Sequence, residues 1–159
     1  MTNFTIRTAE PKDLDTLVDF NARLALETEN LRLSKDVLSR SMQAILQDPR
    51  KGVYLFACEG DKIVGQLMYV YEWSTWHNAN FMWLTDLYVL PQYRRHGVFK
   101  LLSDYAMNLY RTREEVVGLR FYVDKHNTSV VPLYKKIGWK ESNYELWETV
   151  KDGVPVSGK

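Results

Sequence analysis

The sequence has little that would cross-link the chain, carry it through a membrane or hold it on a polyanion. Its 159 residues include one cysteine, so no disulfide can form within the chain. No stretch approaches the roughly 20 apolar residues of a membrane-spanning helix, and the first residues lack the apolar run of a signal peptide. Lys and Arg number 21 against 20 Asp and Glu, a net charge of +1 that argues against nonspecific binding to nucleic acid or membranes. We therefore expect a cytoplasmic protein.

The composition is that of an ordinary globular protein. Hydrophobic residues make up 45% and charged residues 26% of a chain that is long enough for one core and short for two. We expect residues 1–150 to form one domain and residues 151–159, which contain Gly and Pro, to form a flexible tail. Cys58 lies in an apolar segment with no His or charged neighbour before it, which favours a buried, inert thiol over a nucleophile.

Apolar periodicity predicts strands alternating with helices of ordinary length, typical of an α/β or α+β domain with a mixed sheet. Helices are expected over residues 9–28, from a Ser34 cap to 48, from 98 onward and, as a short segment, from 127 to 138. Strands are expected at residues 4–7, 53–58, 63–71, 84–90, 119–123 and 145–150, with a hairpin turn at Gly60 and a loop at 73–80.

The most informative segment is an apolar strand that leads into a basic turn and a helix. Residues 86–102 read DLYVLPQYRRHGVFKLL. A helix start leaves backbone N–H groups free and carries the positive end of the helix dipole, so it can bind phosphate. Arg94 and Arg95 add positive charge there, and Gly97 permits close approach to the backbone. An ordinary turn with two solvated arginines is the alternative interpretation.

A second motif, NTSVVPLYKKIGW at residues 127–139, predicts a short capped helix. Asn127 or the following Thr is a suitable N-cap, Pro132 is tolerated near the helix start, and Gly138 is a plausible terminator. On composition alone, Tyr134 is expected to be a half-buried aromatic residue with its hydroxyl in water.

The two motifs, in this order, resemble those of the GNAT family of N-acetyltransferases. RRHGVF at residues 94–99 is similar to the family's Gln/Arg-x-x-Gly-x-Gly/Ala, and residues 127–139 to Asn-x-x-Ala-x-x-Phe/Leu-Tyr-x-Lys-x-Gly-Phe. The resemblance extends over nearly the whole chain. It implies a single GNAT-like domain with a mixed central sheet, a splayed strand pair and helices on both faces. Acyl-CoA would lie in the wedge between the splayed strands.

Residues 86–94 also resemble the diamine (polyamine) acetyltransferase branch, with two departures. Phe99 stands where the family usually has Gly or Ala, so the pyrophosphate would have to use the other amides. Thr85 stands where diamine acetyltransferases carry a Glu near the acceptor amine. Neither polyamine specificity nor that base can therefore be transferred to this chain.

The resemblance implies acetyl-CoA as cosubstrate and assigns roles to individual residues. Amides from Arg95 to Lys100, with the Arg94 side chain, would bind the pyrophosphate. The Val89 N–H would face the thioester carbonyl, and Tyr134 would protonate the departing thiolate as general acid. The expected cofactor-binding residues are Leu87, Val89, Arg94, Arg95, His96, Gly97, Val98, Phe99, Lys100 and Asn127.

The general base that deprotonates the acceptor amine is left open by the sequence. We prefer Glu72, which ends a strand beside the motif strand among Trp73 and Trp76, where partial desolvation suits a base. Each candidate also has an ordinary structural role. The other candidates are Glu27, Glu29, Asp86, His77 and a water held by the backbone.

A dense aromatic cluster comprises Tyr69, Tyr71, Trp73, Trp76, Phe81 and Trp83. Sheet core and a dimer contact are the roles expected for most of its members, and an acceptor pocket for a cationic or aromatic amine is a further interpretation. We expect a homodimer without a metal that acetylates the primary amine of a small molecule, polyamine-, amino-acid- or aminated-metabolite-like. A protein or peptide acetyltransferase and a catalytically silent acyl-CoA-binding module are the alternatives.

Overall fold

The computed structural model describes residues 3–124, 131–136 and 138–154, which fall into two compact units, residues 1–121 and 122–159. The first unit holds five strands, three helices and three short 3-10 turns. Its elements are β1 (Phe4–Thr8), η1 (Pro11–Asp13), α1 (Leu14–Glu29), α2 (Lys35–Gln47), η2 (Pro49–Lys51), β2 (Val53–Glu59), β3 (Lys62–Ser74), β4 (Ala79–Val89), η3 (Pro91–Tyr93), α3 (Val98–Thr112) and β5 (Val116–Phe121).

The five strands form one mixed sheet in the order β1-β2-β3-β4-β5. The first four strands pair antiparallel with their neighbours, and β5 runs parallel to β4. A parallel neighbour needs a crossover, which α3 supplies between β4 and β5. The α/β class with a mixed sheet, predicted from the periodicity, is confirmed.

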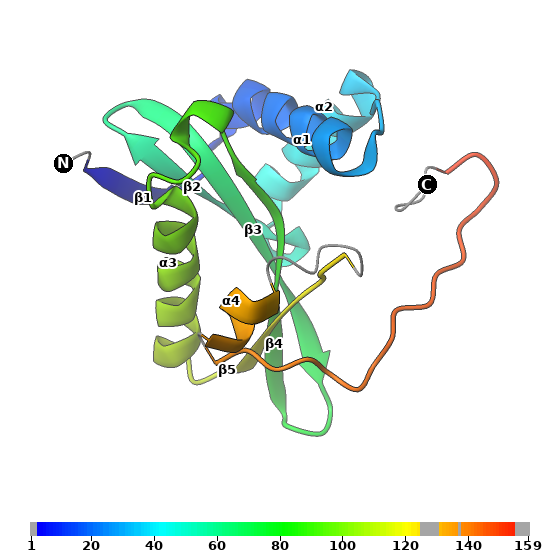
Figure 1. The fold of residues 1–159 in the computed structure, drawn as a ribbon. Coiled ribbons are helices and arrows are strands. Elements are labelled where there is room, and N and C mark those ends of the chain that lie inside the picture. Colours follow the sequence, from blue (N-terminus) through cyan, green and yellow to red (C-terminus); the bar gives the residue numbers. More distant parts are fainter. Residues whose placement is uncertain (1–2, 125–130, 137, 155–159) are drawn as a thin grey trace. The chain divides into compact units, whose positions relative to one another are not determined.

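Helices cover both faces of the sheet because successive side chains of a strand point to opposite sides (Figure 1). On β2, Tyr54 and Phe56 pack with Leu17 of α1 on one face. Leu55, between them, packs with Leu102 of α3 on the other face. Leu17 and Leu102 are both 0% exposed, so shortening either to Ala should cost about 2–5 kcal/mol of stability.

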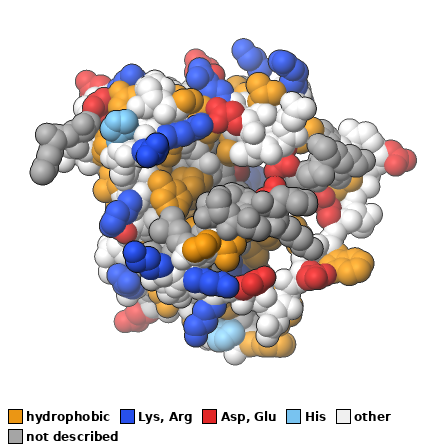
Figure 2. Space-filling view, in the orientation of Figure 1, with side chains coloured by type: hydrophobic (Ala, Val, Ile, Leu, Met, Phe, Trp, Pro, Cys, Tyr) orange, Lys and Arg blue, Asp and Glu red, His pale blue; other side chains and the backbone are white. Residues whose placement is uncertain are grey.

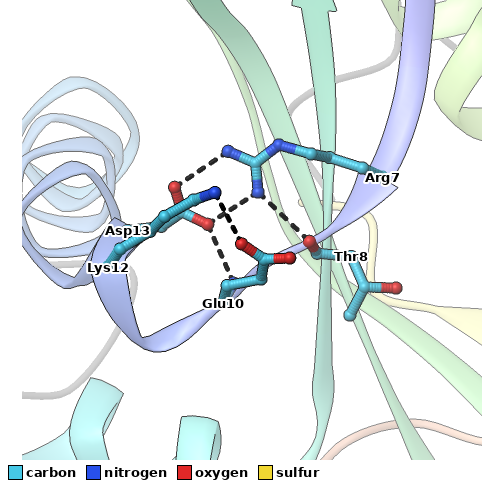
Figure 3. Close-up of polar contacts among 5 residues, drawn as sticks. All are labelled: Arg7, Thr8, Glu10, Lys12 and Asp13. Carbon is cyan, nitrogen blue, oxygen red and sulfur yellow. Dashed lines mark hydrogen bonds and ion pairs between the residues drawn. The ribbon is translucent and has the colours of Figure 1, made fainter. Parts of the chain in front are cut away.

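The junction between β1 and α1 is fixed by a buried carboxylate (Figure 3). Nη1 and Nη2 of Arg7 donate to Asp13, at 2.7 and 2.8 Å, and the backbone N–H of Glu10 donates to the same carboxylate at 2.8 Å. The hydrogen bonds from Arg7 hold the pKa of Asp13 below its usual value. A strand residue thereby anchors the start of the first helix.

The β3–β4 hairpin is longer than the sequence predicted. Residues 73–80 were expected to form a loop, but strand pairing continues through Trp73↔Asn80 and Ser74↔Ala79. Backbone hydrogen bonding extends the ladder here past the end of the apolar alternation. The hairpin turn at Gly60 and the buried Cys58 thiol agree with the sequence prediction.

In the second unit, α4 (Val131–Lys136) ends where the sequence predicted. Gly138 has a φ of +92°, which favours glycine, and its N–H donates to the Lys135 carbonyl at 3.1 Å. The Trp139 N–H donates to the Tyr134 carbonyl at 3.0 Å, completing a helix-ending hydrogen-bond pair. The proposed N-cap, Asn127, lies outside the described residues.

The prediction of a strand over residues 145–150 is wrong. These residues have no regular secondary structure and are exposed, with Trp147 88% accessible. Alternating apolar residues make a strand possible, but a strand forms only along a hydrogen-bonding neighbour. Among the described residues, the sheet consists of the five strands of the first unit.

Candidate active site

The last residues of β4 have an open edge, with no strand beside it among the described residues. Pairing with β5 stops at Leu84↔Phe121, whereas β4 continues to Val89 with β3 on its other side. The Leu90 N–H donates to the Val64 carbonyl of β3 at 3.0 Å. Since backbone groups alternate along a strand, the N–H and C=O of Val89 turn away from β3. An extended ligand can pair with such an edge as an added strand.

A β-bulge interrupts β4 at Asp86, within this open stretch. Met68 is opposite Thr85 and Gln66 is opposite Tyr88, so β4 carries an extra residue at this point. Asp86 has a φ of +50°, the left-handed region, which Asp tolerates better than most residues. The bulge redirects its side chain and backbone compared with a regular strand.

The Asp86 carboxylate is held by two hydroxyl groups. Tyr54 Oη donates to Oδ2 at 2.5 Å, and Thr85 Oγ1 donates to Oδ1 at 3.1 Å. Burial, together with the charge of Asp86, raises the pKa of Tyr54 above its usual value, so the phenol stays a donor. Asp86 itself is half-buried. It is the acidic side chain closest along the chain to the open backbone of Val89.

The turn that follows β4 prepares the start of α3. Arg95 and Gly97 have φ values of +67° and +86°, and α3 begins at Val98 directly after Gly97. A Cβ placed on Gly97 would meet no atom within 4 Å, so the space above its backbone is open. The Val98 side chain is buried, which leaves only its backbone for a ligand. This geometry agrees with an anion site at the helix start.

Arg94 lies at the open edge and already has partners. Its Nε donates to the Val89 carbonyl at 2.9 Å, and its Nη2 donates to Glu27 of α1 at 2.5 Å. The Tyr88 hydroxyl donates to the other Glu27 oxygen at 3.1 Å. The sequence did not predict this pairing of an expected phosphate ligand with a candidate base, because the two residues come from distant elements.

The other expected cofactor residues of the first unit differ in what they leave free for a ligand. The side chains of Leu87 and Val89 pack against the core beneath α3, so these residues have only backbone to offer a ligand. His96 Nδ1 donates to the Arg94 carbonyl at 2.9 Å, and Lys100 pairs with Asp104 at 2.5 Å. Phe99 is half-buried in the first turn of α3.

Glu72, the preferred base, lies away from the bulge. It pairs in register with Phe81, five residues before Asp86, on the order of 17 Å along the strand at the usual rise per residue. Its carboxylate accepts hydrogen bonds from Trp83 Nε1 and from Arg120, the latter at 3.3 Å. Arg120 also stacks over the Phe81 ring. Glu72 is therefore part of a cation–aromatic cluster near the hairpin end of the strands.

His77 and the exposed tryptophans lie at the same hairpin end. His77 Nδ1 is 2.8 Å from Ser74 Oγ, and its ring packs edge-on against Phe81. Trp73 and Trp76 are exposed. The structure does not bring this part of the aromatic cluster to Asp86. Of the other base candidates, Glu29 is the last residue of α1 and is half-buried.

The second unit carries Tyr134 on α4, and burial raises the pKa of its hydroxyl above the usual value. Asn127 lies outside the described residues. Over the part of the chain that is described, no group of three or more His, Cys, Asp or Glu side chains could hold a metal ion. No helix in that part is long and apolar enough to cross a membrane.

Comparison with known proteins assigns the family. The model of the acetyltransferase (GNAT) family matches residues 20–139. A thialysine N-epsilon-acetyltransferase of Caenorhabditis elegans is 28% identical over 160 residues, which cover 99% of this chain and 97% of the relative. A possible acetyltransferase from Clostridium difficile 630, solved by crystallography, is 42% identical with a TM-score of 0.87, over 93% of this chain and 97% of that one.

A crystal structure of a "predicted acetyltransferase with acetyl-CoA" from Clostridium acetobutylicum shares the fold, with a TM-score of 0.74 at 20% identity over 92% of this chain and 96% of that one. The family match covers both the open strand edge and the turn before α3. The chain therefore belongs to the acetyltransferase (GNAT) family and is an acyltransferase with acetyl-CoA as its cosubstrate.

Proposed function

We propose that the chain transfers the acetyl group of acetyl-CoA to the primary amine of a small molecule, polyamine-, amino-acid- or aminated-metabolite-like. One observation carries the proposal: a half-buried carboxylate, Asp86, lies in the same open stretch of β4 as the outward-facing backbone of Val89. The backbone suits a thioester and its pantetheine arm, and the carboxylate suits an ammonium group. The relative from Caenorhabditis elegans is named a thialysine N-epsilon-acetyltransferase, and this name supports an acceptor of this class.

The cofactor would be held mainly by main chain. Amides from Arg95 to Lys100, with the Arg94 side chain, bind the pyrophosphate at the start of α3. The backbone of Leu87 and Val89 pairs with the pantetheine arm, and the Val89 N–H polarises the thioester carbonyl. Asn127 is a further expected contact of the pantetheine arm.

The chemistry is an attack of the neutral amine on the thioester carbonyl. A C–N bond forms, the C–S bond breaks, and the departing thiolate takes its proton from Tyr134. The raised pKa of Tyr134 keeps that proton in place at neutral pH. The proton lost by the amine passes to a base, directly or through a water.

Asp86 is our first candidate for the group that receives the acceptor ammonium, because of its place in the open stretch. Glu72, which lies opposite Phe81 and away from the bulge, remains the candidate for the base. Glu72→Gln should lower turnover most at neutral pH and recover in part at high pH if it draws the proton. Parallel pH–rate curves for wild type and variant would remove Glu72 from the mechanism.

A screen of acceptors tests the proposed function. Free-thiol release from acetyl-CoA is measured with small primary amines, including thialysine, polyamines and amino acids, and with peptides. We expect turnover with a small amine that exceeds turnover with every peptide. Thiol release only with peptides would make the chain a peptide acetyltransferase. Binding of acetyl-CoA without thiol release with any acceptor would support a silent acyl-CoA-binding module.

Three further sequence predictions stand beside this proposal. They are a homodimer, a cytoplasmic location and one catalytic domain over residues 1–150 with a tail over 151–159. The exposed Trp73 and Trp76 support a contact between copies. Basic and acidic side chains are interspersed over the face shown in Figure 2, as the net charge of +1 suggests. Sedimentation velocity of the purified chain tests the dimer.

A further inference from the structure

Polar side chains from three elements are buried beneath the β4 bulge. Asn21 of α1 is 7% exposed, Tyr54 of β2 is 2% exposed and Gln66 of β3 is 0% exposed. All three lie on the face of the sheet that α1 and α2 cover, among apolar neighbours such as Phe56. Burying polar groups costs free energy, so core packing alone does not explain the cluster.

Two of these side chains bind Asp86 directly, and the third, Asn21, contacts Tyr54. Gln66 Nε2 donates to the Asp86 carbonyl at 3.2 Å and so holds the backbone of the bulge. Tyr54 Oη donates to Asp86 Oδ2 at 2.5 Å and holds the carboxylate. Asn21 Oδ1 lies 3.3 Å from the same phenol, while its Nδ2 donates to the Leu17 carbonyl at 2.9 Å. Backbone and side chain of Asp86 are thus fixed separately.

The phenol of Tyr54 has one proton and two acceptors in reach. The carboxylate oxygen is closer than the Asn21 amide oxygen and carries charge, so the proton goes to Asp86. One carboxylate oxygen is therefore directed into the protein. The half-buried carboxylate keeps a fixed orientation at the open edge, although its residue is in the left-handed backbone region.

We propose that Tyr54 is a positioning residue for the reaction: it orients the Asp86 carboxylate so that Asp86 receives the ammonium group of the acceptor. This inference rests on the proposed function, in which Asp86 binds the acceptor. Tyr54 does not itself touch substrate or cofactor. Its ring packs in the core with Leu17 and Phe56, so a Phe at this position keeps the packing and removes only the hydroxyl.

The test is the kinetics of Tyr54→Phe with the best acceptor of wild type. Loss of a hydrogen bond to a charged group should lower kcat/KM for the amine roughly 10- to 100-fold. The loss should come mostly from KM, because the acceptor ammonium is bound less well, while kcat and the affinity for acetyl-CoA change less than about threefold. Tyr93→Phe is the matched control, because it also removes a hydroxyl that donates to a carboxylate, here Glu59 at 2.6 Å.

A double-mutant cycle separates positioning from stability. If Tyr54 acts through Asp86, Tyr54→Phe should have almost no further effect on kcat/KM in the Asp86→Asn background. Two effects that multiply in full, or a Tyr54→Phe variant that loses stability with unchanged kinetics, would overturn the proposal. The control, Tyr93→Phe, should behave alike in both backgrounds.

A crystal structure of Tyr54→Phe gives a readout that needs no acceptor. The Asp86 carboxylate should leave its position, and a carboxylate that stays where it is would overturn the proposal. The kinetic comparison uses whichever acceptor wild type acetylates. A peptide acceptor would therefore overturn the proposed small-molecule function and leave the test of Tyr54 intact.

Discussion

Arg94 Nη2 lies 2.5 Å from Oε2 of Glu27, so a residue expected to bind phosphate is paired with a residue considered as the base. The second Glu27 oxygen accepts from the Tyr88 hydroxyl, and Arg94 Nε donates to the Val89 carbonyl. Both carboxylate oxygens of Glu27 are thus engaged, which weakens its case as a base. A phosphate that binds Arg94 must compete with Glu27.

Glu27→Gln should therefore tighten the binding of acetyl-CoA. The Val89 carbonyl still holds Arg94 in place, and its charge is no longer neutralised by the partly exposed Glu27. We expect Kd to fall about two- to fivefold at low ionic strength and the gain to shrink as salt is added. Calorimetric titration measures both, with Asp36→Asn as a control that removes one negative charge on α2. Weaker binding in Glu27→Gln would show that Glu27 instead orients Arg94.

The double variant Arg94→Ala/Arg95→Ala should weaken acetyl-CoA roughly 10- to 100-fold, the loss expected for hydrogen bonds to a charged ligand at an exposed site. Its thermal unfolding midpoint without ligand should stay close to that of wild type, because both side chains are exposed. Arg50→Ala/Lys51→Ala, at a pair of basic residues that bind Asp48, is the control. Unchanged affinity in the first variant would show that the phosphates are held elsewhere.

Tyr134→Phe should slow acetyl transfer roughly 10- to 1000-fold, the usual contribution of one general acid, and leave acetyl-CoA affinity nearly unchanged. Because burial raises the pKa of Tyr134 above its usual value, the protonated form persists through neutral and mildly alkaline pH. Loss of this proton should therefore not reduce the wild-type rate at any pH up to about 9. Single-turnover rates across pH measure this. Full activity in Tyr134→Phe would mean that the thiolate leaves without help from this residue.

The Arg7–Asp13 pair predicts a stability that depends on pH. The pKa of Asp13 is lowered in the folded protein, so its contribution is complete above the unfolded value of about 3.9 and is lost as pH falls through the folded value. Arg7 is about a third exposed, so we expect Asp13→Asn to cost about 1–2 kcal/mol at pH 7. Urea unfolding at several pH values should show that cost shrinking below about pH 4. A cost that is constant down to pH 2 would contradict the assignment.

Much of the fold could be predicted because its elements are locally determined. Ser34 accepts from the Val37 N–H at the start of α2, as a cap should, and Gly138 ends α4 with a positive φ. The alternation on β2 assigns side chains to two faces, and both faces are covered by helices. These features depend on spacing and residue type over a few positions.

The site was predicted less completely because it depends on contacts between distant elements. Tyr54 and Asp86 are 32 positions apart and Arg94 and Glu27 are 67 apart, and no local pattern joins them. The bulge at Asp86 also has no signature in a strand that alternates normally. Glu72 was favoured because it ends a strand among aromatic residues. The strand register, which the sequence does not determine, places it opposite Phe81 and therefore away from the bulge at Asp86.

Hydrogen–deuterium exchange with and without acetyl-CoA tests the central claim most directly, because it locates the cofactor on the backbone. We predict that acetyl-CoA slows exchange in peptides that cover the open stretch of β4 and the turn before α3, residues 85–100. Peptides from α2 should exchange at the same rate in both states. Protection confined to other segments, with residues 85–100 unchanged at saturating acetyl-CoA, would contradict the account.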